Sequence, residues 1–267
     1  MHFTKRTSPT IFLCVAVLIV SLTAISTVRA QKEIKAPTFE IVDGKIDVFG
    51  LSVEGEATPV QLTHAANILA QWIDNDEDGK PDNPKVVEAI IKAGQRRVGI
   101  IGRRSWVNER DIYLNDGKNP WPYDPKTRRY DATLEELLHC VTQFGYGEAY
   151  PEVFGERAGT TISAALDIAR DSTEHNDGVP KSGYGENAWF HYDDPTCEYG
   201  GCQITEYMYW AITSLVGIQK DRCDEIGQEW ELCTPELMKE KDAAFMKLYN
   251  NPEYNFPKVA PDGTYRK

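Results

Sequence analysis

The feature that most restricts the fold is a short acidic loop between two predicted helices. One helix begins at Thr58 and runs to Ile73, the second begins at Asn83, and each start is followed by the proline that favours a first helical position. Between them, loop positions 1, 3, 5 and 9 carry carboxylates and position 6 is glycine; the acids are Asp74, Asp76, Asp78 and Asp82. Calcium needs six to eight oxygen ligands from a tight loop. We therefore predict a helix–loop–helix calcium-binding unit over residues 58–94.

The acidic loop resembles the loops of EF-hand proteins and the aspartate-rich calcium repeats of thrombospondin type 3. At position 7 the backbone carbonyl of Lys80 can supply a further ligand. The chain departs from the EF-hand at position 12, where Lys85 replaces the usual glutamate, so the completing carboxylate would come from Glu88 or Asp82. The alternative is a solvated acidic turn. However, five acids within nine residues repel one another unless a cation lies among them.

A second candidate site lies on a predicted helix over residues 134–144. Its apolar residues fall on one face, and Glu135, Glu136 and His139 lie on the opposite face. Glu135 and His139 are one helical turn apart, so both can bind a single metal ion, and Glu136 lies beside them, where a general base would activate water. Thr133 is expected to cap this helix, with Glu136 completing a capping box.

This segment resembles the zinc-binding helix of the zincin metallopeptidases, whose pattern is H-E-x-x-H. Glu135 stands in place of the first histidine, Glu136 matches the catalytic glutamate, and His139 matches the second histidine. The resemblance covers about a dozen residues and implies a metal-dependent hydrolase of peptides. Zinc is the metal that it implies, although mixed oxygen and nitrogen ligands also accept manganese or iron. The alternative is an ordinary amphipathic helix with a solvated polar face.

A third ligand is expected from a later helix, as in the zincin subgroup whose third ligand is a glutamate. Glu206 is the candidate, because it is the only charged residue of a strongly apolar predicted helix over residues 203–217. A buried carboxylate must be paired, protonated or bound to a metal. His191, in an aromatic and acidic loop, is the alternative ligand. Glu206 could equally pair with an arginine or with His139 itself.

Residues 1–30 are typical of a secretory signal peptide. Basic residues precede an apolar run over residues 11–25, and small or β-branched residues favour cleavage after Ala30. The run is short for a membrane span, which needs about 20 residues, so we expect no stable membrane insertion after cleavage. An uncleaved anchor is the alternative. The mature chain, residues 31–267, is therefore expected to be secreted.

The cysteines agree with an oxidising compartment, where disulfides form. Five of them follow residue 30, and an odd number leaves one thiol unpaired within the chain. Cys197 with Cys202 and Cys223 with Cys233 would close short local loops. Cys140, inside a predicted helix, is then expected to be a buried free thiol, although its pairing with one of the other four is not excluded.

The hydrophobic periodicity and the helix-start and turn residues along the chain predict a mainly α fold with minor short strands, in a single domain over residues 31–267 with long ordered loops. Strands are expected on either side of a turn at residues 43–45, and further helices over about 160–170 and 234–249. The hydrophobic content of 41% is too high for a disordered chain, and the net charge of −12 argues against nucleic-acid binding.

Two functional hypotheses remain. The first is a secreted calcium-binding protein with a zincin-like metal site, either an active hydrolase of peptides or proteins or a scaffold that lost activity with the first histidine. The second is a non-enzymatic extracellular calcium-binding module with a structural or interaction role. The two hypotheses differ in the distance that they require between Glu206 and His139. The first requires the Glu206 carboxylate to lie within metal-bridging distance of the His139 ring, and the second allows the two side chains to lie far apart.

Overall fold

The computed structural model describes residues 34–55, 57–94, 97–99, 123–124 and 129–267. The expected signal peptide of residues 1–30 lies outside the described residues, as does most of the stretch between residues 100 and 128. Residues 34–267 form one unit. Its described part is mainly helical with a few short strands, so the predicted fold class is confirmed.

The sheet begins with a tight hairpin. β1 (Lys45–Val48) pairs antiparallel with β2 (Leu51–Glu54), and β3 (Arg97–Gly99) adds parallel to β2. The connecting residues Phe49 and Gly50 both have positive φ, as a two-residue type I′ turn requires.

The predicted turn at residues 43–45 is also present, because Asp43 and Gly44 both have positive φ and Val42 and Lys45 exchange two backbone hydrogen bonds at 2.9 and 3.0 Å. The strand expected before this turn is not formed, because residues 39–43 contribute only an isolated bridge between Val42 and Lys45. The Asp47 carboxylate accepts a hydrogen bond from the Gly50 N–H at 3.1 Å, which stabilises the later turn. Alternating side chains of β1 and β2 are then fully buried, so burial of the apolar face selects this register.

The two helices that flank the acidic loop form as predicted. α1 (Pro59–Ile73) begins with a complete capping box between Thr58 and Gln61. α2 (Pro84–Lys92) begins with proline at its first position and ends just before Gly94, whose φ is +84°.

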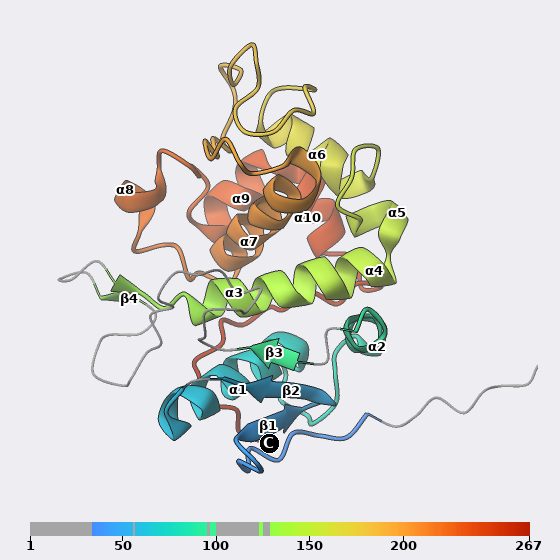
Figure 1. The fold of residues 1–267 in the computed structure, drawn as a ribbon. Helices are drawn as coiled ribbons and strands as arrows, with labels where there is room; N and C mark the ends of the chain where they lie inside the picture. Colours follow the sequence, from blue (N-terminus) through green and yellow to red (C-terminus); the bar gives the residue numbers. More distant parts are fainter. Residues whose placement is uncertain (1–33, 56, 95–96, 100–122, 125–128) are drawn as a thin grey trace, which may run out of the picture. The chain divides into compact units, whose positions relative to one another are not determined.

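A continuous helical rod crosses the molecule and carries the second candidate site. It consists of α3 (Thr133–His139), the π-helical turn η1 (Cys140–Tyr146) and α4 (Gly147–Ala149). α1 packs against α3 and α2 against η1, while α7 (Ile204–Leu215) contacts the rod from another side (Figure 1). The indole N–H of Trp72 donates to the Leu134 carbonyl at 3.1 Å and so joins α1 to α3.

The remaining described elements of the unit are β4 (Tyr123–Asp124), β5 (Arg129–Tyr130), α5 (Pro151–Phe154), α6 (Thr161–Ala169), η2 (Tyr199–Gln203), α8 (Cys223–Ile226), α9 (Pro235–Lys241) and α10 (Ala243–Tyr249). Of these, α6, η2 and α9 pack against α7. The prediction of one helix over residues 234–249 is wrong, because the helix breaks at Asp242. The buried Asp242 carboxylate caps α10 by accepting from the Phe245 N–H at 2.9 Å, and it also accepts from the Tyr207 hydroxyl at 2.8 Å.

The predicted disulfides are confirmed: Cys197 is bonded to Cys202 and Cys223 to Cys233, and Cys140 is a buried free thiol. The first disulfide lies directly before α7 and fastens η2 to the loop that precedes it. Within the described ranges, no helix combines the length and the apolar character that crossing a bilayer requires.

Candidate functional site

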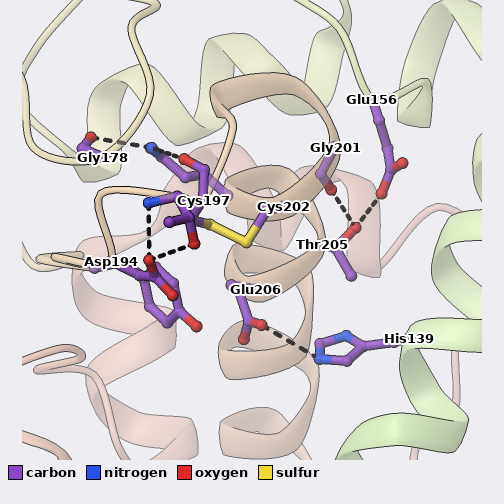
Figure 2. The surroundings of a disulfide bond; sticks show 12 residues. His139, Glu156, Gly178, Asp194, Cys197, Gly201, Cys202, Thr205 and Glu206 are labelled. Atoms are coloured by element: carbon purple, nitrogen blue, oxygen red, sulfur yellow. Dashed lines mark hydrogen bonds and ion pairs between the residues drawn. A yellow bond between two sulfur atoms is a disulfide. The ribbon is translucent and has the colours of Figure 1, made fainter. Parts of the chain in front are cut away.

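Three predicted ligands, from the rod and from α7, lie together. His139 Nε2 is 3.5 Å from Glu206 Oε1 and 3.9 Å from Glu135 Oε1, and Figure 2 shows His139 and Glu206 facing each other from different helices. One ligand atom from each of the three residues lies within 4.8 Å of the others. Ligand atoms of a tetrahedral zinc ion lie roughly 3.3 Å apart, since each is about 2.0–2.1 Å from the metal. The three donors therefore fit one transition-metal ion after small side-chain movements.

Local helix geometry positions these ligands. The α-helical spacing of α3 places Glu135 and His139 one turn apart, and the helix widens to a π-helical turn at Cys140, directly after His139. A second π-helical turn, η2, directly precedes α7, the helix that carries Glu206. Such turns are frequent at functional sites. The hydrophobic pattern predicts the helices but not these turns: Phe144, on the predicted apolar face, is half-buried, whereas Gly145 and Tyr146 are buried.

The group favours a positive charge at its centre. Burial disfavours the imidazolium of His139, but the carboxylates of Glu206 and Glu135 outweigh burial, and the pKa of His139 lies well above its ordinary value. Burial also acts to raise the pKa of Glu135, but the hydrogen bond and the charge of His139 outweigh it and lower that pKa. Either a proton on His139 or a metal cation can supply the positive charge.

The three residues line an open pocket with a volume of about 490 Å³. The predicted general base Glu136 lines the same pocket, and so does the disulfide of Cys197 and Cys202. Figure 2 shows this disulfide. Five of the described lining residues are acidic and none is lysine or arginine; the acids are Glu135, Glu136, Asp194, Glu198 and Glu206. This charge distribution concentrates cations in the pocket.

The His139 ring is oriented by its Nε2 contacts and by packing. Tyr209 meets the ring in an edge-on arrangement, with 5.5 Å between the ring centroids. The other ring nitrogen, Nδ1, is buried, and none of the described residues accepts or donates a hydrogen bond there. Nε2 is thus the ring nitrogen that faces the two carboxylates.

Sequence reasoning missed Glu156, which lies in the loop between α5 and α6. The Thr205 hydroxyl donates to its Oε1, and the Gln143 side-chain amide donates to its Oε2 at 2.9 Å (Figure 2 shows the Thr205 contact). Burial raises the pKa of Glu156, although these hydrogen bonds and the charge of His139 act against it. An acidic residue in an interhelical loop is usually solvated, so no local pattern distinguishes it.

The structure differs from the sequence-based prediction at two further residues, His191 and Thr133. His191, the alternative ligand, lies outside the three-residue group, and its Nε2 is 3.2 Å from Glu231 Oε1. The predicted capping box of Thr133 and Glu136 is wrong, because Thr133 is already inside α3. The buried Asp131 carboxylate accepts from the Thr133 N–H at 2.9 Å instead.

In the acidic loop, the carboxylates of Asp74, Asp76 and Asp82 form a second group within 4.8 Å of one another. Asp82, at position 9, belongs to this group, whereas Glu88 does not. Asp78, another predicted ligand, is not in the group, and the backbone carbonyl of Lys80 stays a prediction because the group contains side-chain donors alone. The Asp78 carboxylate accepts the Lys80 N–H at 2.8 Å and so closes the turn.

The carboxylates of this second group repel one another in a partly buried site. Burial and the charges of Asp76, Asp74 and Asp78 together raise the pKa of Asp82 from 3.8 to about 6, although a hydrogen bond from the Asn75 backbone acts against them. Burial also raises the pKa of Asp74, although hydrogen bonds from Tyr265 and from the backbone oppose it. A divalent cation would remove this repulsion.

The C-terminal segment closes over the acidic loop. The buried Tyr265 hydroxyl donates to the Asp74 carboxylate. The Asn75 side-chain oxygen accepts the N–H groups of Lys258 and Val259, each at 2.8 Å. The loop is therefore ordered by contacts with residues about 190 positions later in the chain.

Comparison with known proteins gives no match: no family model, no curated protein and no solved structure matches the chain.

Proposed function

We propose that this chain is a secreted metal-dependent hydrolase of peptides or proteins. In this proposal Glu135, His139 and Glu206 hold a transition-metal ion, preferably zinc. The observation that carries the proposal is the convergence of these three donors in the wall of a pocket that Glu136 also lines. Secretion is proposed from the N-terminal segment and agrees with the two disulfides.

The chemistry divides between the metal and the protein. Zinc, when bound, supplies a Lewis acid that polarises a carbonyl oxygen and increases the acidity of water. Glu136 accepts the proton of the attacking water and can return it to the leaving amine. The pocket is open to solvent and large enough for part of a peptide, and its acidic wall attracts cations.

Zinc affinity tests the ligand assignment. Glu206→Gln is expected to weaken zinc binding by more than the roughly 10–100-fold that loss of an outer-shell partner costs, because it removes a ligand charge. Competition with a chromophoric chelator measures the affinity. Glu198→Gln is the matched control, since it removes the same charge from the same pocket wall outside the three-residue group. Equal affinities for wild type and Glu206→Gln would contradict the assignment.

The second candidate function is a non-enzymatic calcium-binding module. It is supported by the same His139 geometry, because two carboxylates can satisfy a charged imidazole without a metal. In that case zinc would not bind with high affinity. Glu206→Gln would instead lower stability at neutral pH, because it removes a partner of the imidazolium.

We also propose that the acidic loop binds calcium and that the ion has a structural role. Asp74, Asp76 and Asp82 supply carboxylate oxygens, and backbone carbonyls and water would complete the six to eight ligands that calcium needs. The loop connects α1 and α2, which pack against the rod of the first site. Calcium would thereby stabilise the two helices that pack against the rod carrying the first site.

Asp82→Asn tests the calcium proposal through opposite effects in two conditions. Because the folded-state pKa of Asp82 is raised from 3.8 to about 6, the folded calcium-free protein binds more protons than the unfolded chain between these values. Its stability therefore falls as pH rises through this window. At pH 7.5 in chelator, Asp82→Asn is expected to raise Tm relative to wild type, because it removes a carboxylate whose ionisation destabilises the calcium-free fold. In excess calcium, Asp82→Asn is expected to lower Tm relative to wild type, because the stabilisation from calcium binding is reduced.

Thermal unfolding in calcium and in chelator provides the measurement. Asp221→Asn is the control, because it removes an exposed charge outside the loop and should shift Tm little in either condition. A wild-type Tm that is unchanged by calcium would contradict the calcium site.

A further inference from the structure

The carboxylate of Glu156 joins the two helices that carry the proposed metal ligands. Its Oε2 accepts from Gln143 Nε2 at 2.9 Å, and its Oε1 accepts from the Thr205 hydroxyl. Gln143 lies on η1, four residues after His139, and Thr205 directly precedes Glu206 on α7. Each contact is therefore close in sequence to one member of the three-residue group.

The backbone around Glu156 is also held against the segment that leads into α7. A Cβ atom at Gly200 would lie only 2.7 Å from the Glu156 carbonyl oxygen, so glycine permits this close approach. The Thr205 hydroxyl, besides contacting Glu156, lies 2.8 Å from the Gly201 carbonyl (Figure 2). Glu156 is thus fastened to η2 and α7 by side-chain and backbone packing.

We propose that Glu156 is a positioning residue that sets the separation of His139 and Glu206. The two ligands come from helices that are distant in sequence, and their ligand atoms are 3.5 Å apart. By binding Gln143 with one oxygen and Thr205 with the other, Glu156 resists relative sliding of η1 and α7. The inference rests on the proposed metal site, and it assigns to Glu156 no direct contact with the metal.

Substitutions at Glu156 separate its hydrogen bonds from its charge. Glu156→Gln keeps an oxygen for the Thr205 hydroxyl, and rotation of the Gln143 amide can restore the second hydrogen bond. Glu156→Ala removes both. Glu152→Ala is the matched control, because Glu152 lies in the preceding helix α5 with its side chain 81% exposed and pairs only at the surface with Arg157.

The experiment measures zinc affinity by chelator competition and the visible spectrum of the cobalt-substituted protein. Glu156→Ala is expected to weaken zinc binding by about 10–100-fold, as is typical for loss of an outer-shell partner. It should also change the cobalt spectrum, because the ligand geometry relaxes. Glu156→Gln and Glu152→Ala should retain wild-type affinity and spectrum. A general loss of stability would not produce this difference in a protein that remains folded.

The outcomes distinguish this inference from the proposed function. If wild type binds zinc and folded Glu156→Ala has the same affinity and cobalt spectrum, the positioning role is overturned and the metal site stands. If wild type binds neither metal, both proposals are overturned. Should Glu156→Ala fail to fold, Gln143→Ala removes one side of the connection from a half-buried position. Unchanged zinc binding in that variant would overturn the positioning role.

Discussion

Glu136→Gln is expected to lower the rate of peptide hydrolysis by about 10²–10⁴-fold, the usual contribution of a general base, while zinc binding is retained. Glu136 lines the pocket but is not one of the three clustered ligands. Glutamine has nearly the same shape as glutamate but cannot accept the proton of the attacking water. The expected result is therefore a loss of kcat with the metal still present.

The measurement is kcat/KM on quenched fluorescent peptides, with the zinc content of each preparation determined in parallel. Glu148→Gln is the matched control, because it removes an exposed carboxylate from α4 of the same rod. Full hydrolysis by zinc-loaded Glu136→Gln would contradict the assigned role. A wild-type protein that binds zinc and hydrolyses none of the peptides would instead identify a zincin-like scaffold without activity.

The parts of the fold that the sequence predicts best depend on local chemistry. The start of α1 is specified by Thr58 and Gln61, whose side chains and backbones satisfy each other within one turn. The short disulfides are similarly local, since each pair closes a small loop. Such features depend little on distant parts of the chain, so the local sequence is sufficient to predict them.

Predictions failed where a distant residue competes with a local pattern. Thr133 has the residue type of a helix cap, but it lies inside α3, where the Asp131 carboxylate accepts its N–H and also contacts His64 of α1 at 2.7 Å. The last helix breaks because the Asp242 carboxylate is held by Tyr207 of α7. In both cases a buried carboxylate with two partners outweighs the propensity of the segment.

The two candidate sites differ in how much of them the sequence reveals. Glu206 could be proposed as a partner of His139 because a carboxylate on an otherwise apolar helix needs compensation. Glu156 could not, because its partners come from the rod and from α7. The contact between Tyr265 and Asp74 was equally unpredictable, since residues so far apart in sequence meet only in the folded chain.

Loss of the bound transition metal on substitution of His139 is the other large expected effect. His139 Nε2 is the ligand atom shared by both close contacts of the group, at 3.5 Å from Glu206 and 3.9 Å from Glu135. Removing the imidazole leaves two carboxylates without the nitrogen donor that zinc favours. Residual affinity should be too low to survive dialysis.

Elemental analysis of the purified mature protein is the most direct test of the metal site. Wild type and His139→Ala are dialysed together without chelator and analysed for zinc, manganese, iron and calcium. About one transition-metal ion per chain is expected in wild type and almost none in His139→Ala, with equal calcium in both. Calcium alone in both proteins, with no transition metal in wild type, would contradict the proposed transition-metal site and favour a calcium-stabilised extracellular module.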